Sequence, residues 1–539
     1  MPNLMSSVAN PDAKSLISRL KPGHRHAQTY PPGSAAAWLL ADLATHAKQL
    51  VLILTADPLQ AQRLAHEIGL VNPSLRVRML PDWETLPYDG FSPHQDLISE
   101  RLRTLHALQL NEVDVLTVPI TTALYRLAPP SFLAAYTFSF QQKDKLNEAA
   151  LRDQLVLANY THVTQVTVPG EFCIRGGLID LFPMGSVLPY RLDLFDDEIE
   201  SIKTFDVDTQ RSLYPVPEVQ LLPGREFPMD ETARNRFRST FRDRFEGDPS
   251  RALPYRDMGN GIAFAGVEYY LPLFFDETAT LFDYLPTQAI CVTDGDLQSA
   301  IVRFWDDTKS RYQFLKSDAE RPVLPPDSLF LQTEQLFDHI KGFARLALTP
   351  PSEAIAVCDK QALAYQAVPD VGVNRRADDP LQKLRECLAN RAPKQRVALC
   401  ADSHGRRETI TQMLAEHGIH PDSPIESLQD FLVSDSLFSI VVAPFDAGFI
   451  SVADRLILLT EGDLYPGHAG PSRRTQKEKG RTSDVHAMVR DLAELRAGDA
   501  IVHAQHGVGR YLGLMNMDLG DGEMEFLHLE YAGHSKLYV

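Results

Sequence analysis

The middle of the chain takes its fold from residues 170–211, which read GEFCIRGGLIDLFPMGSVLPYRLDLFDDEIESIKTFDVDTQR. Apolar and polar side chains alternate here with a period of two, which indicates β-strands rather than helices. Around Leu192 this alternation points Leu192 to the core and puts Arg191 and Phe195 on the opposite, more exposed face. The polar residues 196–198 form a turn before a returning strand. The pattern predicts a strand-rich antiparallel unit.

The exposed face of this sheet has two interpretations. It is either a solvated polar surface or a surface on which a partner docks, because an arginine beside an exposed aromatic side chain is a common composition at interfaces. Gly176 and Gly177 interrupt the strand after Arg175, which predicts a bulge or the close approach of another backbone. Periodicity alone leaves both interpretations open.

The composition excludes several classes of protein. The 539 residues carry a formal net charge of −18, which argues against a general nucleic-acid-binding surface but not against a local basic patch. Five cysteines occur without a CxxC pair, so the sequence indicates a reducing compartment and neither a disulfide framework nor a cysteine metal site. The sequence has no signal-peptide pattern and no apolar run of about 18 residues, the length of a membrane span. We expect a soluble cytoplasmic protein without a membrane partner.

Residues 1–137 alternate apolar strands with helices, which predicts a parallel α/β sheet. The run from Leu50 to Leu54 is apolar throughout, as in a strand buried on both faces. A phosphate-binding loop would lie where a strand turns into a helix, and the candidate here is Gly33, Ser34 and Ala35. A working loop also needs a Lys for the phosphates, and the motif GxxxxGK[ST] is absent from the sequence. We therefore predict that the loop is degenerate and that this region binds no nucleotide.

Changes of composition divide the rest of the chain. Residues 222–345 return to mixed α/β character, and residues 346–375 lose periodicity and gain Pro, Ala and Ser, as a linker does. A smaller α/β region follows over 376–470. Residues 471–495 start with a basic, turn-rich stretch that is either a solvated linker or a contact to DNA or an acidic partner, and end in a helix. From 496 onward, short strands separated by glycines predict a small, strongly bent β-barrel.

Two groups of potential metal ligands have simpler explanations. Asp402, His404 and Glu408 lie at the predicted start of a helix, where capping residues are common. His503 and His506 have the spacing of a ligand pair, but no second pair accompanies them. We predict no metal site, no catalytic residue and no cofactor in this chain.

Three motifs resemble known families. Residues 170–211 resemble the UvrA-binding domain that is shared by UvrB and the bacterial transcription-repair coupling factors. The segment DWETLPYD at 82–89, with the SPH at 92–94, resembles the same two families, and HGVGRY at 506–511 looks like the RNA-polymerase-interacting module of the coupling factors, which UvrB lacks. The three motifs in this order identify the chain as the N-terminal part of a member of the coupling-factor family.

The resemblance implies a multidomain α/β fold. A degenerate RecA-like, UvrB-like α/β domain is interrupted by a strand-rich α+β insertion, and a second small α/β domain and a partial, all-β Tudor-like barrel follow. The implied parts are the two halves of the UvrB-like domain (1–137 and 222–345), the UvrA-binding domain (138–221), a linker (346–375), the small α/β domain (376–470), a basic linker and helix (471–495), and the truncated RNA-polymerase-interacting domain (496–539). UvrB has a long β-hairpin that probes damaged DNA after the segment that resembles 82–89, and this sequence lacks room for it.

The resemblance also implies a UvrA contact at Arg175, Arg191 and Phe195. The two guanidinium groups would pair with acids of UvrA, and Phe195 would fill an apolar recess. The family has lost the phosphate-binding loop that UvrB retains. By the same resemblance, ATP, Mg²⁺ and movement along duplex DNA belong to a motor beyond Val539.

For the terminal module, the resemblance implies strand addition to the RNA polymerase β subunit, with Met517, Asn516 and Asp518 at the contact. Methionine suits such a contact because its side chain is flexible and polarizable. Two other functions remain open: a UvrB-like nucleotide-dependent protein that binds damaged DNA, and a stand-alone transcription regulator of the CarD type. The degenerate loop argues against the first, and the second leaves the first 345 residues without a role.

Overall fold

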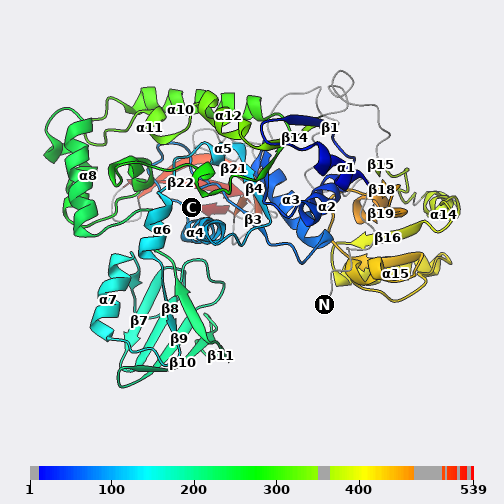
Figure 1. Ribbon diagram of the computed structural model, residues 1–539, viewed down its shortest axis with the longest axis horizontal. Helices are drawn as coiled ribbons and strands as arrows, with labels where there is room; N and C mark the ends of the chain where they lie inside the picture. The colour runs from blue at the N-terminus through cyan, green and yellow to red at the C-terminus, as the bar shows by residue number, and fades with distance from the viewer. Residues whose placement is uncertain are drawn as a thin grey trace. The chain divides into compact units, whose positions relative to one another are not determined.

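The computed structural model describes residues 11–349, 365–374, 376–465, 500–503, 507–518, 523–530 and 536–538 (Figure 1). The chain forms two compact units, Met1–His468 and Ala469–Val539. The basic stretch at 472–481 and His506, both singled out from the sequence, lie outside the described residues.

A six-stranded parallel sheet is the centre of the first unit, in the order β1-β14-β13-β2-β4-β3. Its strands are β1 (Arg25–Thr29), β2 (Val51–Thr55), β3 (Val77–Met79), β4 (Val115–Pro119), β13 (Ile290–Asp294) and β14 (Ala344–Thr349). Every residue of β2 and β4 is buried, which explains the unbroken apolar runs of these strands. The sheet thus combines strands from before and after the inserted unit.

The first unit also contains helices that precede, connect or follow the strands of this sheet. They are α1 (Pro11–Arg19), α2 (Ala35–Ala47), α3 (Pro58–Val71), α4 (Gln95–Gln109), α5 (Ile120–Ala123), α6 (Pro130–Tyr136), α8 (Glu231–Arg244), α9 (Leu253–Gly259), α10 (Leu297–Leu315), α11 (Pro326–Leu329) and α12 (Thr333–Lys341). Local sequence sets where they begin. Asp57 caps α3 by accepting a hydrogen bond from the Gln60 N–H, and Pro58 occupies the first turn, where its missing N–H costs nothing.

The inserted unit is a six-stranded sheet in the order β11-β10-β9-β8-β7-β6, drawn in cyan and green in Figure 1. Its strands are β6 (Thr161–His162), β7 (Glu171–Arg175), β8 (Leu178–Phe182), β9 (Tyr190–Phe195), β10 (Glu198–Phe205) and β11 (Ser212–Pro215). All pairs are antiparallel except β6 with β7, and helix α7 (Glu148–Leu157) precedes the sheet. The predicted antiparallel unit is therefore confirmed.

The two chain segments that connect the insertion to the rest of the first unit are neighbouring strands. Strand β5 (Phe138–Gln141) pairs antiparallel with β12 (Glu218–Leu221), so the two ends of the insertion lie side by side. The buried face of the inserted sheet, with Phe172 and Leu192, belongs to the same apolar core as α4 and the central sheet. The insertion meets α4 directly, where the Gly185 N–H donates to the Ser99 hydroxyl at 2.7 Å.

One of the two alternatives predicted for Gly176 and Gly177 is confirmed, and one predicted domain boundary needs correction. Gly176 and Gly177 form the turn of the β7–β8 hairpin rather than a bulge, and Gly176 has the positive φ of 60° that such a turn uses. The predicted close approach exists at Gly177, whose carbonyl oxygen accepts the Leu194 N–H at 2.7 Å. The boundary predicted after Arg345 falls inside β14, because Leu346 and Leu348 are buried between β1 and β13.

A second α/β region follows within the first unit. Its sheet has the order β15-β18-β19-β16-β17, formed by β15 (Tyr365–Gln366), β16 (Arg396–Ala401), β17 (Phe438–Val442), β18 (Phe449–Ser451) and β19 (Leu456–Thr460). Its helices are α14 (Gln382–Ala389), α15 (His404–Glu416), α16 (Leu428–Val433) and α17 (Glu461–Leu464). Ser403 caps α15 by accepting the Arg406 N–H, as a capping residue before His404 should.

The second unit is an antiparallel sheet in the order β20-β21-β22-β23. Its strands are β20 (Ala500–His503), β21 (Gly507–Asp518), β22 (Glu523–Glu530) and β23 (Lys536–Tyr538). β21 is longer than the short strands that the glycines of this region predicted, and its register against β22 shifts between Tyr511 and Gly513.

Candidate partner-binding surfaces

The inserted sheet brings Arg175 and Arg191 together on one buried carboxylate. Asp180 lies directly opposite Arg191 in the β8–β9 register and is 1% exposed. Arg191 donates from Nε to Asp180 Oδ1 at 2.7 Å and from Nη2 to Oδ2 at 2.9 Å, and Arg175 Nη2 donates to Oδ2 at 2.6 Å. One negative charge on β8 therefore orients two cations, one on each neighbouring strand.

The exposure expected for Arg191 is wrong. Its side chain is only 16% exposed, its Nη1 also donates to the Gln210 carbonyl oxygen, and its guanidinium stacks over the Phe205 ring at 4.8 Å. Hydrogen bonding to Asp180 raises the pKa of Arg191, so it stays charged. The acid in the otherwise apolar strand 178–182 was the sequence signal for this pair, and the sequence reading missed it.

Arg175 and Phe195 remain available at the end of the same sheet. The Arg175 side chain is 52% exposed, and Phe195 is 74% exposed. Leu178, which pairs with Arg175 across the hairpin turn, is 37% exposed. The Leu194 N–H bond to Gly177 holds the end of β9 against this turn. A cation and two apolar side chains are thus presented together beside a tight turn.

The edge strand of the insertion adds an apolar surface that sequence reasoning missed. All residues of β11 are exposed, and Leu213 and Tyr214 are 51% and 53% exposed. Among the described strands it pairs only with β10, at the end of the sheet order. An unpaired edge with apolar side chains is a surface to which another strand can add.

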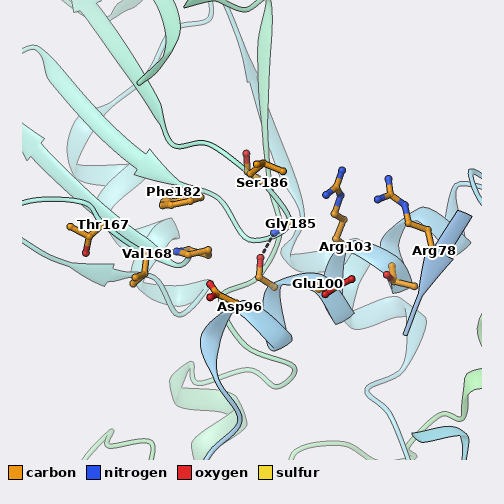
Figure 2. Close-up of a pocket in the computed structure, with 13 residues that line it drawn as sticks. Arg78, Asp96, Glu100, Arg103, Thr167, Val168, Phe182, Gly185 and Ser186 are labelled. Atoms are coloured by element: carbon orange, nitrogen blue, oxygen red, sulfur yellow. Dashed lines mark hydrogen bonds between the residues drawn. The ribbon is translucent and has the colours of Figure 1, made fainter. Parts of the chain in front are cut away.

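A groove of about 460 Å³ lies between α4 and the loops that flank β7 and β8 (Figure 2). In Figure 2, Arg78 and Arg103 point the same way at one end, with Glu100 below them and Asp96 further along. Burial and the nearby charge of Arg103 lower the pKa of Arg78, and burial raises the pKa of Glu100. Cations and carboxylates are balanced in number, so the groove does not select strongly for one sign of charge.

The candidate nucleotide-binding loop at Gly33, Ser34 and Ala35 forms hydrogen bonds to other parts of the protein. Gly33 has a φ of +58°, and Ser34 is fully buried before α2. The Ser34 hydroxyl donates to Glu67 Oε1 at 2.7 Å, and the Ser34 N–H donates to the Ala447 carbonyl oxygen at 3.0 Å. Both polar groups of Ser34 are therefore engaged within the protein, beside Ala35 at the first turn of α2.

In the second unit, Asn516, Met517 and Asp518 lie at the end of β21. They pair with β22 in register, Met517 opposite Met524. β20 pairs only with residues 507–510, so within the strands that the structure describes, the other edge of residues 511–518 has no partner. This leaves an open strand edge at the residues that the resemblance assigned to RNA polymerase.

The described residues contain neither a cluster of metal ligands nor a helix suited to crossing a membrane. In the described ranges, no three His, Cys, Asp or Glu side chains gather as metal ligands, and Cys173, Cys291, Cys387 and Cys400 are free. Among these same residues, no helix combines the length and the apolar character that crossing a membrane requires.

Three family comparisons match separate parts of the chain. Residues 138–227 match the UvrB interaction domain, residues 391–464 match the MFD, D3 domain, and residues 495–539 match the CarD-like/TRCF RID domain. Whole-chain comparison gives 40% identity over 508 residues to the transcription-repair-coupling factor of Escherichia coli K12, covering 94% of this chain and 43% of that protein. The chain is related to the transcription-repair-coupling factors.

Other coupling factors agree with this relation. The Haemophilus influenzae protein is 38% identical over 512 residues, and the Bacillus subtilis protein is 23% identical over 564 residues. The chain spans less than half the length of these curated relatives, 44% and 45%. The resemblance stated from the motifs is therefore confirmed over nearly the whole of this chain.

Proposed function

We propose that this chain is a recruitment module of transcription-coupled nucleotide-excision repair. Its inserted sheet binds UvrA, and its terminal strands bind the β subunit of RNA polymerase. The observation that carries the first contact is the exposed pair Arg175 and Phe195, held at one end of a sheet that matches the UvrB interaction domain. With such partners the protein acts in the cytoplasm, next to the bacterial chromosome.

Arg175, Arg191 and Phe195 have different roles in the proposed UvrA contact. Phe195 supplies the apolar anchor, and the half-exposed Arg175 supplies a cation that a carboxylate of UvrA can reach. Arg191 is a positioning residue, because Asp180 and Phe205 already occupy its guanidinium. It fixes Asp180, and Asp180 in turn orients Arg175.

The polymerase contact uses the open edge of β21 at Asn516, Met517 and Asp518. Backbone N–H and C=O groups of an edge strand give affinity, and the side chains give specificity. The four antiparallel strands and the match to the CarD-like/TRCF RID domain support a Tudor-like module. Changing Met517 to Arg should weaken binding of the β subunit and leave UvrA binding unchanged.

We further propose that the first sheet is a degenerate RecA-like domain that holds no nucleotide. Its parallel strand order and the lack of GxxxxGK[ST] support this, as do the internal partners of Ser34. ATP hydrolysis, with Mg²⁺, and movement along duplex DNA are functions we assign to no residue of this chain. A nucleotide titration that gave tight, magnesium-dependent binding would favour the UvrB-like alternative instead.

Co-purification tests the proposal as a whole. The chain should retain UvrA and, separately, the polymerase β subunit. Arg175→Ala and Phe195→Ala should lose UvrA and keep the β subunit, whereas Met517→Arg should do the reverse. Retention of the β subunit without UvrA would indicate a CarD-type regulator and would contradict the recruitment role.

A further inference from the structure

The N-terminus of α2 is covered by a loop from the second α/β region. The Ser34 N–H donates to the Ala447 carbonyl oxygen at 3.0 Å, and the Ala447 N–H donates back to Ser34 Oγ at 3.3 Å. These reciprocal bonds join residues more than four hundred positions apart. In an open α/β sheet, this end of a helix that follows a strand is where an anionic ligand is usually received.

Glu67 converts this place into a site for N–H and O–H donors. Its carboxylate, on α3, is 1% exposed, and Oε1 accepts both the Ser34 hydroxyl at 2.7 Å and the Asp446 N–H at 3.0 Å. A buried carboxylate repels a phosphate and needs donors around it. The same side chain therefore disfavours a nucleotide and favours the backbone of the loop.

Arg63 adds an ion pair across the same contact. One turn before Glu67 on α3, it donates from Nη1 to Asp446 Oδ2 at 3.2 Å and from Nη2 to the Tyr30 hydroxyl at 3.3 Å. Burial opposes the charge of Arg63, but the neighbouring Glu67, Tyr30 and Asp446 together raise its pKa. Both partners of the ion pair are largely covered, with 22% and 31% of their side chains exposed.

Glycines and aromatic rings make the fit close. A Cβ on Gly33 would collide with the Gly448 carbonyl oxygen, and the Gly448 N–H is itself held by Asp463 Oδ2 at 2.9 Å. Directly beyond the loop, Phe449 meets Trp38 of α2 edge-on, with ring centroids 5.6 Å apart. The loop is thus fixed from its own region before it reaches α2.

We propose that the α2 N-terminus is a docking site for a loop of this same chain, and that the region 365–465 serves to occupy it through Asp446–Gly448. Glu67 is the residue that selects this occupant. At this edge of the first sheet, the contacts of Ser34, Arg63 and Glu67 with the loop form an interlock that joins the two α/β regions. The interlock does not rest on the proposed partners, because it shares no residue with Arg175, Phe195 or β21.

Hydrogen–deuterium exchange of the whole chain tests the interlock. Glu67→Ala should accelerate exchange of the segments 30–38 and 444–450 together, by about tenfold or more, since both lose a bond to a buried charged acceptor. Glu67→Gln should stay within about threefold of the parent chain, because an amide oxygen still accepts both bonds. Exchange in β9 and UvrA retention should not change in either variant.

A double-mutant cycle separates the ion pair from general destabilisation. In the parent chain, Asp446→Asn should accelerate hydrogen exchange of segments 30–38 and 444–450. In an Arg63→Gln background, the same substitution should have little further effect on that exchange. The pair Arg76 and Asp114, joined at 2.8 Å just before β3 and β4, has the more exposed arginine, at 50%, and is the matched control. Its cycle should leave exchange of both segments unchanged. The proposal is overturned if Glu67→Ala accelerates hydrogen exchange of 30–38 while 444–450 stays protected. It is also overturned if Asp446→Asn accelerates exchange equally in the parent chain and in the Arg63→Gln variant.

Discussion

Replacing Asp180 by Asn should destabilise the inserted sheet much more than removing Arg175. Asp180 is 1% exposed and accepts three charge-assisted bonds, two of them from the largely covered Arg191. Removing one partner of a buried pair costs about 3–5 kcal/mol because the other charge stays buried. Because Arg191 keeps some solvent contact, we expect Asp180→Asn to cost about 3 kcal/mol, the lower end of that range. The ion pair of the half-exposed Arg175 with Asp180 contributes less than about 1 kcal/mol to the stability of the sheet.

The local free energy of opening is the quantity to measure, because a chain of several packed regions does not unfold in two states. Native-state hydrogen exchange of β8 and β9 reports it directly. Asp180→Asn and Arg191→Ala should each lower it by about 3 kcal/mol, and the double variant should be little worse than either. Arg175→Ala should change it by less than about 1 kcal/mol.

The control lies on the same face of the sheet. Asp193 pairs with Lys203 at 2.9 Å, with side chains 28% and 40% exposed, so Asp193→Asn should cost below about 1 kcal/mol. If Asp180→Asn left the opening of β8 unchanged, or if Arg175→Ala cost as much as Arg191→Ala, the view that Asp180 and Arg191 form the structural pair would be refuted.

Two further expectations concern buried acids of the first unit. Glu226 accepts bonds from the Trp83 indole at 3.0 Å and from Arg101 at 2.7 Å, so Glu226→Ala should cost about 3–5 kcal/mol in local exchange around α4, with Glu226→Gln milder. Burial raises the pKa of Glu268 to about 7, so the folded state binds more protons than the unfolded state from about pH 4.5 to 7, and stability falls as the pH rises through that window. Glu268→Gln keeps an acceptor for the Ser92 hydroxyl and should raise the local free energy of opening at residues 267–273 at pH 8 but not at pH 4.5, as measured by hydrogen exchange. An equal rise at both pH values would contradict the charge argument.

Local patterns in the sequence were sufficient for the strands and for several helix starts. Alternation around Leu192 gave the antiparallel insertion, and the unbroken apolar run at 50–54 gave a buried parallel strand. These patterns depend on which face of an element is buried, and neighbouring residues carry that information. At Gly176 and Gly177 the sequence left a bulge and a close backbone approach open. It did not identify the hairpin turn, because a turn and a bulge use the same glycine conformation.

Contacts between distant segments were not predictable in the same way. Alternation placed Arg191 on the face opposite Leu192, but its burial depends on Asp180 in the neighbouring strand and Phe205 above it. The cover of Ser34 by Ala447 depends on how two sheets pack, which no short pattern encodes. Sequence reasoning therefore placed Arg191 on the correct face of the sheet and misjudged its exposure, and its assignment of a UvrA contact stays a prediction.

The most direct test of the recruitment role is a titration of UvrA against Phe195→Asp and Phe314→Asp. Both phenylalanines are exposed, at 74% and 86%, but Phe314 lies on α10, outside the inserted sheet. Loss of an aromatic anchor should weaken UvrA binding by about thirtyfold or more for Phe195→Asp and leave Phe314→Asp equal to the parent chain. Equal affinity of all three proteins for UvrA would contradict the account.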